Sequence, residues 1–297
     1  MHLANPVVLA TPFFIALVVA EMVYGRLSGR ARYEPRDTAA SLLMGFGNVI
    51  IAGLFAFIFL DLARLLHPYR LADLGFSLPV FAVCFVLDDL IYYWWHRASH
   101  RMRWLWANHV NHHSSQHYNL STALRQSWGE QFTPGVLFLM PLVAIGFPVP
   151  MILFVHGLNL VYQFWIHTEA IDKLPRAFEA VMNTPSHHRV HHATNPAYLD
   201  SNYAGVFIVW DRLFGSFVAE REDEPPRYGI VHNLATFNVL KIAFHEWLGL
   251  LADLRRAKSL REIVCYVFAP PGWSADGSRE TTDSLKAQWD ASRAPAE

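Results

Sequence analysis

The chain has 297 residues, of which 53% are hydrophobic, 14% are aromatic and only 16% are charged. Its formal net charge of −1 provides no basic surface for nucleic acid, and its two cysteines form neither a CxxC motif nor a disulfide framework. A composition this apolar is typical of an integral membrane protein.

Three apolar runs in the first hundred residues are long enough to be membrane helices. Residues 6–24 are almost entirely apolar, and residues 39–60 carry no charge. At about 1.5 Å per residue, such helices cross a hydrocarbon core of about 30 Å. Residues 78–95 form the third run, which contains Asp88 and Asp89 and ends in aromatic residues of the kind found at membrane surfaces.

A fourth apolar stretch, residues 133–166, is too long for one crossing. It has no formal charge, but as a single helix it would measure about 51 Å. Pro148 and Pro150 interrupt it, so we expect a helical hairpin with arms at 133–147 and 150–166, each short enough to be re-entrant. The expected fold class is therefore all-α, an integral membrane protein with about four transmembrane or re-entrant helices.

The arginines predict an orientation. Four lie between the first two runs and two between the second and third: Arg26, Arg30, Arg32 and Arg36, then Arg64 and Arg70. Because cationic residues favour the cytoplasmic side, we expect the first connection in the cytoplasm of a bacterial cell whose inner membrane holds the protein. A secretory signal peptide is not expected, since the arginines follow the first apolar run. We expect residues 1–270 to form one membrane-embedded catalytic domain, with a core at about 80–220, and residues 271–297 to form a polar tail.

Histidine is the residue type that stands out, with 16 copies. The first of three motifs, His96 and His100, has the spacing i, i+4. The other two have the spacing i, i+3, i+4: His109, His112 and His113, then His188, His191 and His192. Residues at these spacings share one face of a helix. Counting the crossings puts all three motifs on the cytoplasmic side, where we expect a histidine-rich helical cap.

These motifs predict a metal centre. Sites made only of imidazoles suit iron, copper, nickel or zinc, and eight rings exceed what one ion can use, so we expect two ions. Asp89 shares a helical face with His96 and His100, and we expect it to accept the free N–H of a ligating imidazole. Asp88 points elsewhere and is the weaker candidate.

The other histidines receive plainer interpretations. His117 and His187 lie beside the motifs and are candidates to support a ligand, while His156, inside the hairpin, is open to either interpretation. The scattered histidines are expected to be ordinary polar residues: His2, His67, His232 and His245.

With these motifs, the sequence resembles the fatty acid hydroxylase and sterol desaturase superfamily of membrane diiron enzymes, over about residues 88–217. Its order of HxxxH, HxxHH and HxxHH is specific to that superfamily. Four stretches look like the branch that contains alkylglycerol monooxygenase: HHSSQHYNLSTALRQS (112–127), FWIHTEAI (164–171), NTPSHHRVHHATN (183–195) and NYAGVFIVWDRLFGSF (202–217).

The resemblance implies that the eight motif histidines are iron ligands and that His167 is a ninth. Relatives have a further HxxxH where this chain has Gln163 before His167, so one iron site is expected to be more open. The implied chemistry is activation of dioxygen at two iron ions and hydroxylation, desaturation or ether cleavage of a lipid in the bilayer. No flavin or nicotinamide motif is present, so we expect a separate electron donor, by analogy a reduced pterin.

Two other classes of protein could use histidines in this pattern. A metal-binding or metal-transport protein would use the same histidines without redox catalysis, but a transporter would place its ligands along the spans at mid-bilayer. A zinc-dependent membrane hydrolase is disfavoured, because no carboxylate stands at a general-base spacing inside a histidine motif.

Overall fold

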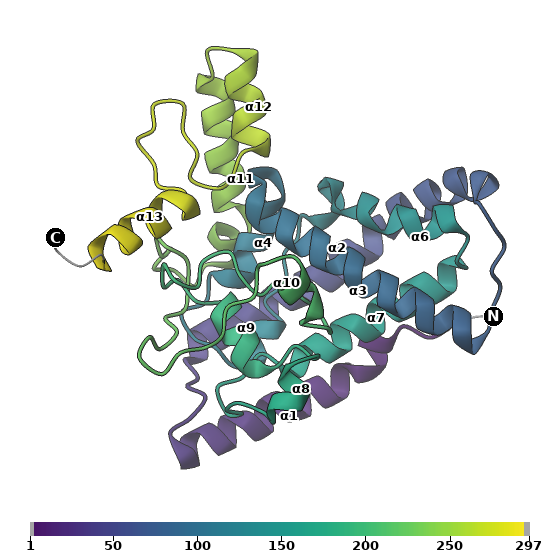
Figure 1. The fold of residues 1–297 in the computed structure, drawn as a ribbon, viewed down its shortest axis with the longest axis horizontal. Helices are drawn as coiled ribbons and strands as arrows, with labels where there is room; N and C mark the ends of the chain where they lie inside the picture. Colours follow the sequence, from purple (N-terminus) through teal and green to yellow (C-terminus); the bar gives the residue numbers. More distant parts are fainter. Residues whose placement is uncertain (1–2, 294–297) are drawn as a thin grey trace.

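The computed structural model describes residues 3–293, and within them every element is a helix (Figure 1). Two isolated β-bridges, Met182 with Phe207 and Ala193 with Tyr228, tie loops together. The helices in chain order are α1 (Pro6–Ser28), α2 (Pro35–Leu66), η1 (His67–Tyr69), α3 (Leu78–Arg101), α4 (Arg103–His113), α5 (Leu120–Ala123), η2 (Glu130–Phe132), η3 (Pro134–Leu139), α6 (Met140–Ile145), α7 (Val149–Trp165), α8 (Arg176–Glu179), α9 (Pro185–His191), α10 (Val209–Leu213), α11 (Val239–Arg256), α12 (Leu260–Phe268) and α13 (Thr282–Arg293).

Three of these helices are long and apolar enough to cross a membrane: α1, α2 and α3. They confirm the three expected spans and extend each of them. Helix α3 continues beyond the apolar run to Arg101, so that it carries the first histidine motif in its last turns. Helices α1 and α2 expose large apolar side chains such as Phe13, Phe46 and Leu54, as helices in contact with lipid do.

The expected hairpin is also present, but its two arms differ. The prolines break the chain as predicted, and α7 begins at Val149. The first arm consists of a 3₁₀ segment, η3, followed by the six-residue α6, so it is shorter than a bilayer is thick. The tip of the hairpin meets the α2–α3 connection, where the backbone N–H of Leu71 donates to the carbonyl of Ala144 at 2.8 Å.

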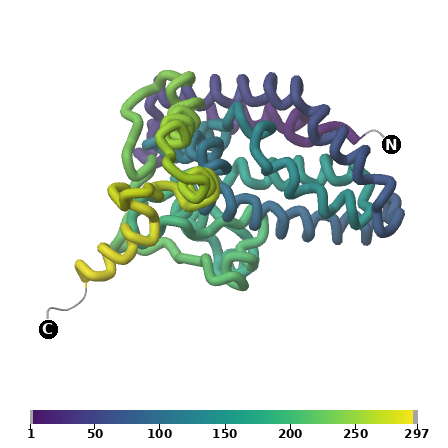
Figure 2. The backbone as a smooth tube through the Cα atoms, turned by 90° about the horizontal axis from the view of Figure 1, so that it is seen from above, coloured from purple at the N-terminus to yellow at the C-terminus, as the bar shows by residue number. Residues whose placement is uncertain are grey.

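The long helices run side by side, with a polar cap at one end (Figures 1 and 2). The hairpin tip and the α2–α3 connection lie at the other end. The C-terminal ends of α3 and α7 therefore reach the cap together. A core of buried side chains, including Cys84, Leu142 and Ile152, joins α3 to both arms of the hairpin. This packing fixes where α3 and α7 deliver their terminal residues.

The buried carboxylate of Glu21 ties α1 to the cap. It accepts hydrogen bonds from the hydroxyls of Tyr33 and Thr168 and, at 2.7 Å, from the backbone N–H of Leu120. An acidic residue in an apolar helix is thus satisfied by three donors from separate segments, which holds α1 against the loop that follows α7.

Candidate metal centre

The end of α3 and the start of α4 bring the first two histidine motifs together. His96 and His100 lie one turn apart near the end of α3. Met102 then adopts an extended conformation with φ −126° and ψ 118°, which ends α3 and turns the chain into α4. Helix α4 carries the second motif on the face that looks back at α3, and the ring centroids of His96 and His109 are 4.7 Å apart.

The remaining histidines come from the other side of the cap. Helix α9 carries His188 and His191, and His192 is its C-terminal cap. His167 follows directly after α7, two residues beyond Trp165. Four separate segments therefore supply the nine histidines that the sequence singled out.

The nine side chains separate into two groups. Within each group, every histidine offers one ring nitrogen, Nδ1 or Nε2, and these nitrogens all lie within 4.8 Å of one another. The larger group holds five rings and the smaller holds four: His96, His100, His109, His113 and His191, and then His112, His167, His188 and His192. The groups are adjacent, since the rings of His113 and His192 stack at a centroid distance of 4.3 Å.

Backbone carbonyls fix the tautomer of several of these rings. The Nδ1 atoms of His96, His167 and His191 lie 2.7, 2.7 and 2.9 Å from the carbonyl oxygens of Tyr203, Gln163 and Ser201, respectively. A carbonyl oxygen only accepts, so each Nδ1 must carry the proton and donate it. The Nε2 atom of each of these rings is therefore left with a lone pair.

These lone pairs converge on common points. His167 Nε2 lies 3.1 Å from His112 Nε2 and 3.0 Å from His188 Nε2. In the larger group, the Nε2 atoms of His96 and His109 are 2.9 Å apart. Two nitrogens that each lie about 2.1 Å from one ion at right angles are about 3.0 Å apart, so this spacing fits a shared metal ion.

Unpaired buried nitrogens support the same interpretation. In the larger group, the Nε2 atoms of His100 and His191 are buried without a hydrogen-bond partner. Buried polar atoms are rarely left unpaired, and a bound cation would engage the converging nitrogens. The donor set, all imidazole with no thiolate, suits iron, copper, nickel or zinc.

The environment keeps the rings neutral. None of the nine histidines is more than 8% exposed. Burial lowers the pKa of His109, His113 and His191 well below the usual 6.5, and the neighbouring imidazoles act in the same direction. Burial also lowers the pKa of His167, to about 4. Neutral rings at pH 7 are the form that binds a metal ion.

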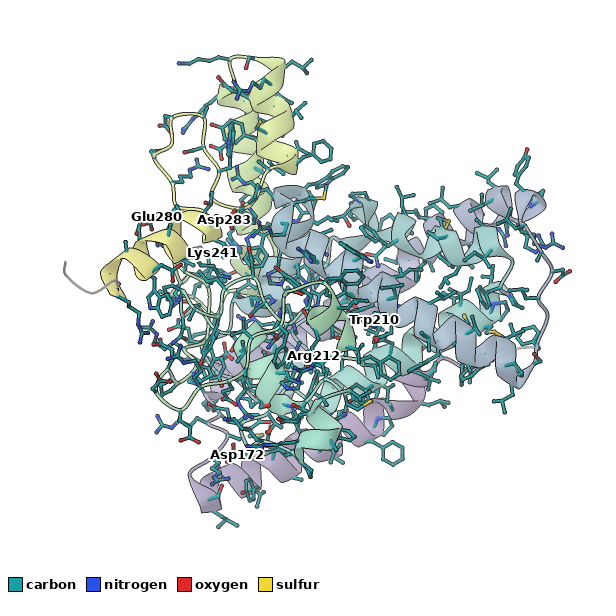
Figure 3. All side chains as sticks on the ribbon, viewed as in Figure 1. Asp172, Trp210, Arg212, Lys241, Glu280 and Asp283 are labelled. Atoms are coloured by element: carbon teal, nitrogen blue, oxygen red, sulfur yellow. The ribbon has the colours of Figure 1, made fainter. Side chains whose placement is uncertain are left out.

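Asp89 does not make the contact that we expected of it. Its carboxylate accepts from the backbone N–H groups of Val206 and Phe207, at 2.7 and 2.9 Å, and from the indole of Trp210, at 2.9 Å. Trp210, labelled in Figure 3, belongs to α10. Seven residues along a helix span about 10.5 Å, so a shared face does not bring Asp89 to His96. The carboxylate instead anchors the loop whose Tyr203 carbonyl holds His96.

Gly205, in that same loop, has no room for a side chain. A Cβ atom there would lie 2.6 Å from Asn159 Oδ1 and 2.8 Å from Asp89 Oδ1. We expect Gly205→Ala to lower the free energy of unfolding by about 2 kcal/mol, as overpacking does, and to weaken metal binding. Thermal unfolding and metal content of the purified variant measure this.

Gly53→Ala is the matched control, because a Cβ at Gly53 would meet no atom within 4 Å. That variant should be unchanged or slightly more stable, by up to about 1 kcal/mol, since alanine favours helix. Equal behaviour of the two variants would contradict the tight approach at residue 205.

Comparison with known proteins agrees with this geometry. The family model for fatty acid hydroxylases matches residues 81–216, the segment that contains all nine histidines. Residues 81–216 are thus similar to the fatty acid hydroxylase family. Human alkylglycerol monooxygenase is 40% identical over 268 residues, which are 89% of this chain and 59% of that protein. Ornithine lipid hydroxylase OlsE of Rhizobium tropici is 26% identical over 273 residues, 89% of this chain and 80% of that protein.

A third relative is human cholesterol 25-hydroxylase, 26% identical over 164 residues, which are 51% of this chain and 56% of that protein. The chain thus spans about three fifths of the length of the alkylglycerol monooxygenases it matches. No solved structure gives a significant match.

Gln163, where the sequence departs from the family pattern, stays out of both groups. Its side-chain amide donates to Asn159 Oδ1 at 2.8 Å, and its carbonyl accepts from His167. The residue therefore orients a histidine through its backbone. The group that contains His167 is the smaller one, with four histidines, and this chain has Gln163 where the family pattern has a further histidine.

The other histidines lie outside the two groups, and His2 lies outside the described residues. His156 Nδ1 lies 3.1 Å from Asp88 Oδ1. His187 is buried with its Nε2 4.0 Å from Glu179, and His117 is partly buried. His67, His232 and His245 are also elsewhere in the fold, as expected of ordinary residues.

The sequence did not reveal several residues that orient or pack against these nine histidines. Asp200 lies 3.5 Å from His100 Nδ1, and Asp211 accepts from the backbone N–H groups of Tyr203 and Ala204, both at 2.8 Å. The ring of Tyr118 packs 5.2 Å from that of His192. Tyr118 and Asp211 lie in two of the stretches that resemble the family, whereas Asp200 lies between two of them.

Proposed function

We propose that this chain is the catalytic part of an iron-dependent lipid monooxygenase. The carrying observation is the pair of adjacent, buried, all-histidine groups at one end of a bundle of lipid-exposed helices. The relatives support it by name, as an alkylglycerol monooxygenase, an ornithine lipid hydroxylase and a cholesterol hydroxylase. We also propose that residues 1–270 act as one membrane-embedded catalytic domain and that residues 271–297 form a polar tail.

In this proposal the nine histidines hold two iron ions. When bound, the irons supply reductive activation of dioxygen, and the overall reaction R–H + O₂ + 2e⁻ + 2H⁺ → R–OH + H₂O requires two electrons from outside. The protein's own residues hold the imidazoles in the correct tautomer and exclude bulk water. The smaller group, with four rings, leaves the more open coordination sphere for small molecules.

The substrate in this proposal is an amphiphile that reaches the cap from the bilayer. Helices α3 and α7 both run from a lipid-exposed part to the histidines at their ends. An acyl chain of the substrate that lies along them would therefore point at the metal centre. Whether the product is an alcohol, an alkene or a cleaved ether depends on which bond is placed there. We propose a separate electron donor, with a reduced pterin as the first to test by analogy with the alkylglycerol branch.

We also propose that the cap faces the cytoplasm of a bacterial inner membrane. The arginines of the α1–α2 connection support this orientation, because they lie at the same end of the spans as the histidines. The alternative, a metal transporter, fits less well. A transporter holds its ligands along the spans near mid-bilayer, whereas these groups lie where α3 and α7 end.

The function is tested with iron-loaded protein in lipid nanodiscs. We expect oxygen consumption that depends on added lipid and on a reductant, supplied in parallel as tetrahydropterin or as reduced ferredoxin. With ¹⁸O₂, a hydroxylated lipid gains one labelled oxygen, whereas a desaturated one loses two hydrogens. Fully loaded protein that consumes no oxygen with any lipid extract, with either reductant, would refute the monooxygenase and leave the metal-binding alternative.

A further inference from the structure

Helices α11 and α12 form an antiparallel pair that projects sideways from the bundle. In Figure 1 the pair projects away from the long helices and across their direction, and in Figure 2 it is seen nearly end-on. If α1, α2 and α3 cross a bilayer, the pair lies parallel to the membrane surface. We call residues Val239–Phe268 the lateral hairpin.

The lateral hairpin lies at the level where α2 begins. Ile242 and Ala243 of α11 pack against Ala40 and Met44 in the first turns of α2. Because α2 enters the cap-side surface of the membrane within these turns, the hairpin is placed at the boundary between lipid and water.

The attachment to the bundle is rigid. Arg103, at the start of α4, donates from Nε to Glu246 and from Nη1 to Asp253, both at 2.7 Å. Arg279 also forms an ion pair with Asp253, at 2.6 Å. These pairs are largely buried, so breaking one would leave a buried charge. The orientation of α11 therefore follows that of α4, which carries three of the histidines.

Both helices of the lateral hairpin expose large apolar side chains. On α11, Leu240, Phe244, Leu248 and Leu251 are 43–65% exposed and lie within about 80° of one another around the helix. Their stripe is on the side away from the buried residues. Helix α12 adds four more exposed side chains: Leu260, Ile263, Val264 and Phe268. A group of eight exposed apolar side chains on two packed helices points to an interaction site.

The tip of the hairpin is strongly basic. Its four cations are all exposed: Arg255, Arg256, Lys258 and Arg261. None of them forms an ion pair with a residue in the described range 3–293. The acids of α11 are already engaged by Arg103 and Arg279. Lys241, labelled in Figure 3, adds a cation near the base of α11.

We propose that the lateral hairpin is an interfacial anchor that lies in the headgroup layer of an anionic bilayer. An apolar stripe bordered by cations is the pattern of helices that bind in the plane of the membrane, and anionic lipids attract such cations. The anchor rests on the proposed membrane topology but not on catalysis. Through Arg103 it would couple the lipid surface to the helix that holds His109, His112 and His113.

The test places a nitroxide label on the stripe, in full-length protein in nanodiscs. Cys265→Ser removes the partly exposed thiol, while Cys84 is buried. Leu248→Cys carries the probe, and Glu222→Cys, at an exposed loop position, is the matched control. In phosphatidylcholine with phosphatidylglycerol, we expect the ratio of oxygen to nickel-chelate accessibility to be about 5-fold higher at residue 248 than at 222.

A second arm tests the charge. Replacing Arg255, Arg256, Lys258 and Arg261 together by glutamine should reduce that ratio toward its value in pure phosphatidylcholine. Equal ratios at residues 248 and 222 in both lipids would overturn the proposal. So would dipolar broadening between labels on two copies, which would identify the stripe as a protein interface. Neither outcome depends on metal content or oxygen consumption, so the monooxygenase proposal is tested separately.

Discussion

Replacing His191 by alanine should reduce bound iron from about two ions per chain toward one and lower lipid oxidation by about 100-fold or more. His191 belongs to the five-histidine group, its Nδ1 donates to the Ser201 carbonyl, and its buried Nε2 has no hydrogen-bond partner. His112→Ala should do the same in the four-histidine group. Iron content by elemental analysis and oxygen uptake measure both effects.

His232→Ala is the matched control, since His232 is exposed and outside both groups. It should keep wild-type iron content and activity. If His191→Ala and His112→Ala also keep their full iron content, the assignment of these histidines as ligands is wrong. A loss confined to one of the two variants would show that only one group binds metal.

Asp89→Asn is expected to have the second largest effect, although Asp89 touches no histidine. An amide in its place presents an NH₂ group to donors that now face a carboxylate, from Val206, Phe207, Trp210 and Asn159. Hydrogen bonds to a charged group contribute about 1.5–3 kcal/mol each, so we expect the free energy of unfolding to fall by about 3 kcal/mol. Metal affinity should fall about 10-fold, because the loop that holds His96 loses its anchor.

Thermal unfolding of the purified variant in detergent measures the change in stability. Iron titration of the same protein measures the change in metal affinity. Asp61→Asn provides the control, since Asp61 is exposed and pairs only with Arg64 on the same helix. It should change neither stability nor iron binding. Wild-type iron affinity in Asp89→Asn would show that the loop keeps its position without the carboxylate.

Local patterns in the sequence were sufficient to predict most of the fold. Long charge-free runs predicted α1, α2 and α3, and Pro148 and Pro150 predicted where α7 begins. The grouping of the histidines also followed from spacing, since residues at i and i+4 must share a helical face. These features depend on neighbours in the chain, which is why a single sequence reveals them.

Contacts between distant segments could not be predicted in this way. The partner of His96 is the carbonyl of Tyr203, a backbone atom 107 residues away that has no side-chain signature. Asp89 was assigned to the wrong partner because a helical wheel gives direction around the axis but not distance along it. The apolar run 133–147 also did not show that its first part forms the 3₁₀ segment η3 instead of an α-helix.

The two groups, of five and four histidines, consist of neutral imidazoles and bring no formal charge to the centre. The nearest carboxylate, Asp200, already faces Arg101 at 3.0 Å. Two divalent ions held here would keep their full positive charge in a buried site, where charge is poorly screened. Such a centre favours the more reduced metal and draws anions toward it, because net charge sets a buried metal's reduction potential. Azide or a similar small anion should therefore bind more tightly after oxidation than before.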